Sequence, residues 1–407
     1  EGVDEWPGIS VVGRIILDIS TIGGNLDCRF SSFDGGGACS LQAKAIHVKG
    51  RVRFNKSEFH GVVNFAMARI DFSFCGENAK YNYGYKQDKW TLGVALNLDS
   101  AIINGDANIN DVIVNGCIRI CNVQFKKNLV LTNMNINGSN CDESGFYAIR
   151  ADAMNVADGL FFYNENQEDN QNKFHINGCV SLSYASAGQL NDKWCIWPNK
   201  YSIDGFIYRS IGGESKCDIL KRKKWLENDG GDDVFHPQPF DHLANIYVDD
   251  GMSSHAKNIL IHKNKCKLKK RDGDKIERLI LRAFGLTLRY GYKPYVSLAW
   301  IAGLVAIGAI SFHFGYEGGN MYPSKEWVYR SECYYSEKEC DGWHRVGNGI
   351  FKIPNNYPEF SSIVYSSETL IPFLHLYQSD YWRPKPSGEG YFYTIYLWVH
   401  ILLGWIF

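Results

Sequence analysis

Small or apolar side chains recur at a fixed spacing in the first half of this 407-residue chain. Val94, Gly105, Gly116, Lys127 and Gly138 mark a register of eleven residues, and small or apolar residues follow the first four marks at offsets of two, four, seven and nine. This set contains Leu96, Leu98, Ala101, Ile103, Ala107, Ile109, Val112, Val114, Ile118, Ile120, Val123, Phe125, Leu129, Leu131, Met134 and Ile136. Residues two apart share one face of a strand, so each repeat predicts two short strands. An α-helix cannot place these offsets on one face.

The same offsets follow Gly50 and Gly61, and Gly178 begins a weaker copy. In this pattern a small residue stands two positions before a large apolar one, and each face takes five residues. The pattern resembles that of the pentapeptide-like β-helices in a loosened form. The resemblance implies a mainly β fold, a right-handed parallel β-helix over residues 1–230, with an extra residue and Gly-type backbone freedom at every second corner. Two repeats would form a coil of about 22 residues, and coils would stack about 4.8 Å apart. A β-sandwich is the alternative, but its turns would not keep one spacing across five repeats.

Three segments interrupt the repeat: Gly35–Gly37, Tyr81–Trp90 and Asn164–Lys173. We expect each to leave the solenoid at a corner as a loop, where solenoids often bind ligands. The second segment is rich in aromatic residues, which either form a stacking platform for a sugar or peptide or a flap that covers coil edges. The candidate platform residues are Tyr81, Tyr83, Tyr85 and Trp90.

Residues 231–293 change to helix-forming composition and become strongly basic. Apolar residues at helical spacing on both sides of Gly251 look like one tetratricopeptide-type αα-hairpin, and we expect this hairpin to cap the last coil. Lys263–Lys293 holds eleven basic and three acidic residues, directly before an apolar run. The sequence therefore predicts a basic neck on anionic lipid headgroups. Its surface residues are Lys265, Lys267, Lys269, Lys270 and Arg271.

The apolar run predicts a transmembrane helix over residues 294–315, because twenty residues of helix span about 30 Å of hydrocarbon. A second run over residues 391–407 predicts another transmembrane helix that is cut short, and residue 1 is not Met, so we expect the sequence to be a fragment. The basic flank predicts that the solenoid lies on the cytoplasmic side of the membrane. Residues 316–390 would then form an extracytoplasmic loop.

Cysteine and charge restrict the remaining chemistry. Cys333 and Cys340 lie close together in the predicted outer loop and could form a disulfide there. The other ten cysteines are expected to be reduced packing residues, as at Cys28, Cys117 and Cys121. No metal or cofactor is assigned, because the histidines at 236, 242, 255 and 262 include no i, i+4 pair. A net charge of −1 gives no overall case for nucleic acid.

The segment Phe360–Phe373 precedes the second apolar run and resembles the pore helix of two-helix channels. The resemblance stops at the selectivity filter, where Pro372 and Phe373 replace a carbonyl-lined loop, so potassium selectivity is not implied. The segment is otherwise expected to lie as a re-entrant or interfacial helix. Its pore-like residues are Thr369, Pro372, Phe373 and His375.

Residues 235–407 resemble a group of uncharacterised bacterial membrane proteins that carry pentapeptide-like repeats. The matching motifs are Phe-His-Pro-Gln-Pro-Phe at 235–240, Leu-Arg-Tyr-Gly-Tyr-Lys-Pro at 288–294, and Ile-Pro-Phe-Leu-His-Leu-Tyr-Gln with Tyr-Trp at 371–382. The resemblance implies a bacterial inner (plasma) membrane, with the solenoid on its cytoplasmic side. Some members are labelled membrane-associated oxidoreductases. This chain has no dinucleotide-binding glycine motif, haem-attachment motif or redox cysteine pair, so no catalytic residue is assigned.

These patterns lead to three hypotheses for function. The first is a non-enzymatic, membrane-anchored scaffold whose cytoplasmic solenoid binds an unknown protein partner. The second is a channel-like or effector pore, and the third is an enzyme such as a membrane-associated oxidoreductase. A homo-oligomer is compatible with each of them.

Overall fold

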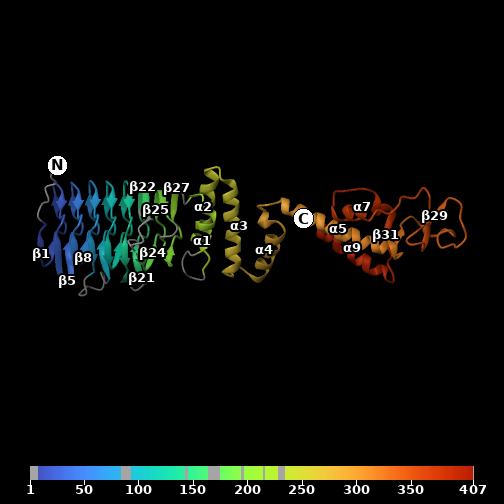
Figure 1. The fold of residues 1–407 in the computed structure, drawn as a ribbon, viewed down its shortest axis with the longest axis horizontal. Coiled ribbons are helices and arrows are strands. Elements are labelled where there is room, and N and C mark those ends of the chain that lie inside the picture. Colours follow the sequence, from blue (N-terminus) through green and yellow to red (C-terminus); the bar gives the residue numbers. More distant parts are fainter. Residues whose placement is uncertain are drawn as a thin grey trace. The chain divides into compact units, whose positions relative to one another are not determined.

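The computed structural model describes residues 8–83, 93–142, 145–163, 175–193, 197–213, 216–227 and 234–406. The chain divides into two compact units, an N-terminal unit of residues 1–273 and a C-terminal unit of residues 274–407. The N-terminal unit contains two large, almost wholly parallel sheets built from very short strands (Figure 1). Its strands stack coil on coil, so this part of the chain is a parallel-strand solenoid, as the repeat predicts.

The strands form four columns, and some longer strands belong to two columns. The first column contains β1 (Ser10–Val12), β5 (Ser32–Gln42), β8 (Glu58–Asn64), β11 (Lys80–Asn82), β15 (Ile113–Asn115), β19 (Asn135–Asn137) and β23 (His175–Asn177). The second contains β2 (Ile15–Ile16), β12 (Val94–Asn97), β16 (Cys117–Arg119), β21 (Gly145–Arg150), β24 (Cys179–Ser181) and β26 (Tyr201–Ser202), with the far ends of β5 and β8. β20 (Ser139–Asp142) pairs antiparallel with β21.

The other sheet supplies the remaining two columns. The third contains β3 (Thr21–Ile22), β6 (His47–Val48), β9 (Arg69–Ile70), β13 (Ile102–Ile103), β17 (Gln124–Phe125), β22 (Asn155–Phe162), β25 (Ser186–Asp192) and β27 (Ile207–Ile211). The fourth contains β4 (Leu26–Asp27), β7 (Val52–Arg53), β10 (Phe74–Cys75), β14 (Ala107–Asn108) and β18 (Leu129–Val130), with the far ends of β22, β25 and β27.

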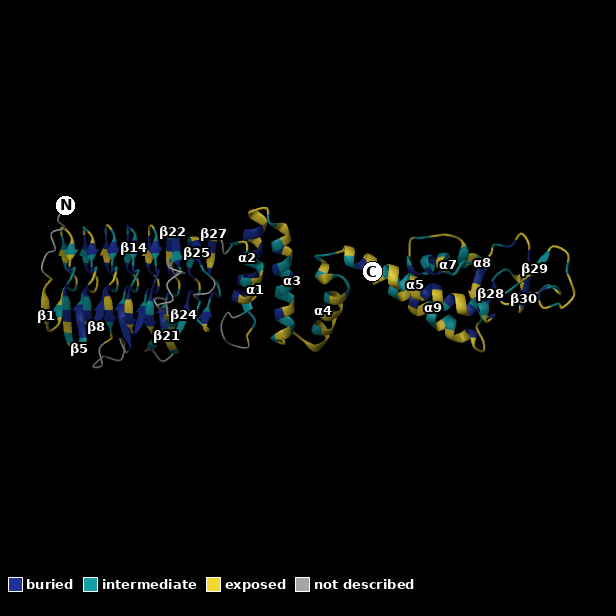
Figure 2. Ribbon diagram, viewed as in Figure 1, coloured by how far each residue is buried: buried dark blue, intermediate teal, exposed yellow. Residues whose placement is uncertain are grey.

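The coil length follows from the register. Val52 pairs with Phe74, and Ala107 pairs with Leu129, so partners in successive coils are 22 residues apart. The sixteen inward residues of the best repeats are each at most 3% exposed. Figure 2 shows this buried strip continuing from coil to coil. The inward stripe predicted from the eleven-residue spacing is therefore the core of the solenoid.

The corner between the two strands of a repeat adopts a left-handed backbone. Lys56, Met67 and Asn78 have positive φ at intervals of eleven residues, as do Ser100, Asp111, Asn122 and Asn133 further along the chain. The amide of Ser57 bonds to the carbonyl of Phe54, which closes the turn around Lys56. The expected Gly-type freedom is thus met here by other residue types. Glycine is required at Gly61, where φ is 125° and a Cβ would overlap the carbonyl of Ala38.

Two predicted interruptions lie partly within the sheets. Gly35–Gly37 does not leave as a loop, because it is a bulge inside the continuous strand β5, where the register shifts between Asp34 and Cys39. After the second interruption, Phe74 pairs with Ala107, 33 residues later, so coil stacking resumes in register. Asn164–Lys173 lies outside the described residues.

Among the residues that the structure describes, three α-helices follow the last coil in the N-terminal unit: α1 (Ile219–Glu227), α2 (Gln238–Asp249) and α3 (Ser253–Lys269). The side chain of Gln238 accepts a hydrogen bond from the Gly205 amide at 3.0 Å, and His242 Nε2 lies 2.9 Å from both the amide nitrogen and the carbonyl oxygen of Tyr208. These contacts satisfy backbone groups that the next coil would otherwise pair. Residues of α2 therefore cover the free edge of the stack.

A fully buried ion pair attaches α1 to the solenoid. Arg222 Nη2 and Nη1 lie 2.6 and 3.0 Å from the two carboxylate oxygens of Asp192 in β25. The indole of Trp197 donates to the same carboxylate at 2.7 Å. The Arg222 guanidinium also lies 5.0 Å from the ring centre of Trp225. Because a buried charge is tolerated only when it is paired and hydrogen-bonded, these partners fix where α1 docks.

The C-terminal unit is mostly helical. It contains α4 (Lys275–Thr287), η3 (Arg289–Gly291), α5 (Tyr295–Glu317), β28 (Met321–Pro323), α6 (Glu326–Tyr329), β29 (Trp343–Val346), β30 (Phe351–Pro354), α7 (Ser362–Leu370), α8 (Gln378–Tyr381), β31 (Trp382–Pro384) and α9 (Gly390–Gly404). Phe312 of α5 is fully buried, with ring centres of Tyr365 in α7 and Tyr396 in α9 at 4.9 and 5.4 Å. An aromatic cluster around Trp382 continues this core.

The buried stripe makes a direct stability prediction. We expect Phe54→Ala to destabilise the solenoid by about 3–5 kcal/mol, because Phe54 is fully buried among Phe59, Phe65 and Phe74. Phe72→Ala is the matched control, since Phe72 is 54% exposed and its loss should change stability by less than about 0.5 kcal/mol. Urea unfolding followed by circular dichroism measures both variants. Equal effects of the two substitutions would contradict the assignment of Phe54 to the core and of Phe72 to the surface.

Candidate functional site

A pocket of about 230 Å³ lies beside the helices that follow the last coil. Leu226, Phe235 and Phe240 provide apolar walls, and Lys269 and Lys270 add two basic side chains. Lys270 Nζ donates to the Val234 carbonyl at 2.7 Å, which holds that lysine against the segment before α2. We call this space the cap pocket.

Three potential metal ligands meet at the cap pocket. His262 and Cys266 are four residues apart on α3 and face the last residue of α1, Glu227. His262 Nε2 lies 3.0 Å from Glu227 Oε1 and 3.6 Å from Cys266 Sγ. All three ligand atoms lie within 4.8 Å of one another. Of the residues that the structure describes, this is the set of three found close enough to hold a metal ion.

The surroundings of Cys266 and His262 favour the neutral forms of these two side chains in the metal-free protein. Burial raises the pKa of Cys266 to about 11, and the neighbouring Glu227 carboxylate adds to the shift. Burial also lowers the pKa of His262, while Glu227 and a hydrogen bond to the Lys223 carbonyl act in the opposite direction. The imidazole is therefore uncharged near neutral pH, which is the form that binds metals.

The spacing of the histidines alone does not predict this set, because it contains one histidine. The available signal was the His262–Cys266 spacing, since residues four apart share one face of a helix. The contribution of Glu227 was not predictable from spacing, because it depends on where the Arg222–Asp192 pair docks α1. His236 lines the pocket without joining the three-residue set.

The predicted lipid-facing residues lie at and after the end of α3. Lys265, Lys269 and Arg271 are exposed, while Lys267 and Lys270 are half-buried. Lys267 Nζ lies 4.0 Å from Asp272, so the charge of Lys267 has an acidic neighbour. Contact with lipid stays a prediction for this group.

The predicted aromatic platform is wrong for Tyr81. This residue is fully buried in β11, where its ring stacks on Phe59 with centres 5.5 Å apart. Phe33 of the preceding coil also stacks on Phe59, with ring centres 5.0 Å apart. The three rings form an aromatic stack inside the solenoid. Tyr83 is exposed. Tyr85 and Trp90 lie outside the described residues.

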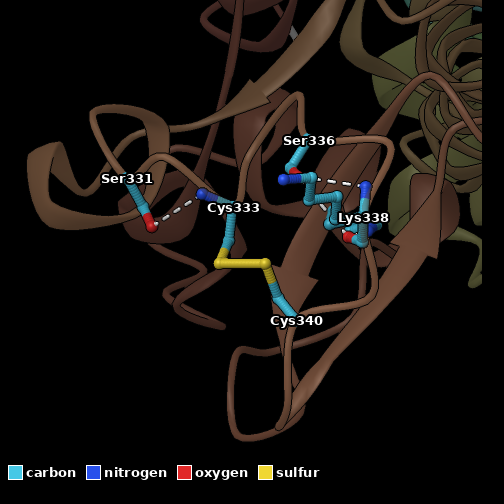
Figure 3. The surroundings of a disulfide bond; sticks show 6 residues. Ser331, Cys333, Ser336, Lys338 and Cys340 are labelled. Carbon is cyan, nitrogen blue, oxygen red and sulfur yellow. Dashed lines mark hydrogen bonds between the residues drawn. A yellow bond between two sulfur atoms is a disulfide. The ribbon is translucent and has the colours of Figure 1, made fainter.

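Cys333 and Cys340 form a disulfide in the C-terminal unit (Figure 3). The Cys333 amide donates to Ser331 Oγ at 3.3 Å, and the Lys338 amide donates to Ser336 Oγ at 3.2 Å, so short turns shape the intervening loop. The prediction that all other cysteines are reduced is wrong for Cys117, which is disulfide-bonded. Its position in β16 brings oxidised cysteine into the solenoid as well. Cys28 and Cys121 are buried free thiols.

The pore-like residues are dispersed around the end of α7. The Thr369 hydroxyl donates to the Tyr365 carbonyl at 2.8 Å, within its own helix. Phe373 is 91% exposed. His375 lies 3.5 Å from Glu368 and 3.6 Å from Asp380, next to the turn that contains Pro372. His375 is thus paired with carboxylates, and the Thr369 hydroxyl is hydrogen-bonded within its own helix.

Polar side chains also meet between α5, α7 and α9. Ser366 Oγ lies 3.0 Å from the Val305 carbonyl and 3.1 Å from His400 Nε2, and both side chains are buried. Gly308 of α5 makes room for this contact, because a Cβ there would overlap Ser366 Oγ and approach the His400 ring. Hydrogen bonds of this kind hold apolar helices together.

Comparisons with protein-family models, with curated proteins and with solved structures find no match for this chain.

The close approach at Gly308 gives a second prediction. We expect Gly308→Ala to destabilise the helical C-terminal unit by about 1–3 kcal/mol, because the added methyl group overpacks the Ser366–His400 contact. Gly303→Ala is the matched control on the same helix, since nothing lies within 4 Å of a Cβ there. Thermal unfolding of the full chain in detergent measures both. A neutral Gly308→Ala would contradict the described packing of these helices.

Proposed function

We propose that this protein is a membrane-anchored, non-enzymatic scaffold whose solenoid presents a rigid polar wall to a protein partner. The observation that carries the proposal is the exposed apolar surface of α5 in a chain whose other unit is a polar-walled solenoid. The bilayer would cover the helix, and the solenoid would be held near the membrane surface.

Among the described residues, α5 is the one helix long and apolar enough to cross a membrane. Its 23 residues would extend about 35 Å, compared with a hydrocarbon core of about 30 Å. Only 22% of its most apolar stretch is buried within the protein, whereas the core helix of a soluble protein is mostly buried. Ile307, Ile310 and Phe314 are among the exposed side chains.

Two neighbouring helices also expose apolar side chains. None of the residues of α4 is buried, and its exposed apolar residues Ile276, Ile280 and Phe284 recur at a spacing of four. Basic residues Arg278 and Arg282 lie on the same helix, as expected for a helix at an anionic membrane surface. In α9, Trp398 and Leu402 are exposed. Together with α5, these surfaces are suited to lipid rather than water.

The proposed partner surface is a row of asparagines along the first column. Asn82, Asn115, Asn137 and Asn177 are register partners in successive coils. The Asn115 amide donates to Asn82 at 2.8 Å, and the Asn177 amide donates to Asn137 at 2.9 Å. These bonds order the side chains before any partner arrives, which lowers the entropic cost of binding. We call these four residues the asparagine row.

The sidedness of the chain needs a separate test. A cytoplasmic solenoid follows from the positive-inside rule, but disulfides persist mainly in oxidising compartments. The N-terminal unit contains disulfide-bonded Cys117, and the C-terminal unit contains the Cys333–Cys340 disulfide. Labelling of exposed Cys217 with a membrane-impermeant thiol reagent, in intact and in opened cells, distinguishes the two orientations.

The scaffold proposal predicts both membrane retention and position-dependent cross-linking. The full chain should stay in the membrane pellet after an alkaline carbonate wash. Ile307→Arg together with Ile310→Arg should release it, because each charge near a helix centre costs about 2.5–3.5 kcal/mol of insertion free energy. A photoreactive residue at Asn115 or Asn137 should then capture one and the same protein from these membranes.

Matched positions provide the controls. Ile113→Arg changes an exposed solenoid residue and should leave membrane retention intact. A photoreactive residue at exposed Lys126, in the other sheet's wall, should not capture the same protein. A soluble wild-type chain would contradict the anchor, and equal or absent cross-linking at all three positions would contradict the scaffold. Single-channel conductance of the reconstituted chain would favour the pore instead.

A further inference from the structure

The geometry around His262 distinguishes a metal site from a catalytic relay. In a cysteine–histidine–carboxylate relay, the thiol and the carboxylate contact opposite nitrogens of the imidazole ring. Here Cys266 Sγ and Glu227 Oε1 both lie close to Nε2, at 3.6 and 3.0 Å. The three atoms therefore face one common point instead of forming a chain for proton transfer.

The spacing of these atoms fits a tetrahedral ion. Bonds of about 2.3 Å to sulfur and about 2.0 Å to nitrogen, at a tetrahedral angle, place those two atoms about 3.6 Å apart. The observed distance between Cys266 Sγ and His262 Nε2 is 3.6 Å. Glu227 Oε1 already lies 3.0 Å from His262 Nε2. A small movement of the Glu227 side chain would bring this oxygen to the distance required of a ligand, and Glu227 is free to make it because it is half-buried at the end of α1.

Nε2 is the nitrogen of the His262 ring that faces the other two groups, because it lies 3.0 Å from Glu227 Oε1 and 3.6 Å from Cys266 Sγ. An ion bound between these groups would therefore replace any proton on Nε2.

We propose that Glu227, His262 and Cys266 bind one Zn²⁺ ion at the edge of the cap pocket. A thiolate, an imidazole and a carboxylate form a donor set that suits zinc, and three protein ligands leave the fourth position open. The cap pocket adjoins the ligands, because Cys266 and Glu227 are among its lining residues. Lys269 and Lys270 line the same pocket, so water or a small anionic group is the chemical class expected as the fourth ligand.

The ion would also connect two helices. Glu227 belongs to α1, which is attached to the solenoid by the Arg222–Asp192 pair, while both other ligands belong to α3. A metal at this point would restrain α3 relative to the last coil. This role is independent of membrane anchoring and of any protein partner, so the scaffold proposal and the zinc site stand or fall separately.

Cobalt substitution tests the site in the full chain purified in detergent and freed of metal with a chelator. We expect one Co²⁺ per chain, with the near-ultraviolet charge-transfer band of a thiolate ligand, and displacement of the cobalt by Zn²⁺. Cys266→Ser should remove that band, and His262→Gln should weaken Zn²⁺ binding by at least about 100-fold. Cys217→Ser is the control, because Cys217 is an exposed free cysteine of the same unit, and it should leave the band unchanged.

A second measurement covers the case in which Cys266→Ser does not fold. Zn²⁺ should protect Cys266 of the wild-type chain from alkylation, as mapped by mass spectrometry, and should not protect Cys217. Failure of the wild-type chain to bind cobalt or zinc at one ion per chain would overturn the proposal. So would a thiolate band that survives both His262→Gln and Cys266→Ser, or alkylation of Cys266 that Zn²⁺ does not change.

Discussion

Burial of one side-chain stripe, repeated every eleven residues, is the constraint on which the N-terminal unit depends. Because partners in stacked coils are 22 residues apart, each coil places its inward side chains on those of the previous coil. Interruptions are tolerated only where they restore that register, as the β5 bulge and the segment between Phe74 and Ala107 do. The same stacking leaves a free edge at the last coil, and Gln238 and His242 satisfy its backbone groups.

The two units differ in where their polar and apolar side chains lie. In the solenoid, polar side chains line the outer walls and bond along the stack, as in the asparagine row, and the buried Asp192 carboxylate is paired with Arg222. In the C-terminal unit, apolar side chains of α5 lie outside, while Ser366 and His400 meet inside the helix bundle. This inversion is expected when one unit is surrounded by water and the other by lipid. It is the physical basis of the proposed membrane anchor.

Local periodicity predicted much of the solenoid, and contacts between distant residues account for what it missed. Extending the Gly50 and Gly61 register by one more repeat places Tyr81 at the inward offset of nine, so its burial was accessible from the sequence. The Arg222–Asp192 pair was not, because 30 residues separate its members and no local pattern joins them. The His262–Cys266 pair had a visible helical spacing, but Glu227 is brought to it only by the docking of α1.

Cross-linking between neighbouring coils tests the stacked arrangement most directly. Native Cys75 is a free cysteine in β10, and its register partner in the next coil is Asn108 of β14. Adjacent strands lie about 4.8 Å apart, so Asn108→Cys should be joined to Cys75 by a short thiol-reactive cross-linker, as mapped by mass spectrometry. Asn97→Cys lies eleven residues earlier in the other sheet and should not be joined to Cys75. A link from Asn97→Cys in place of Asn108→Cys would contradict the solenoid.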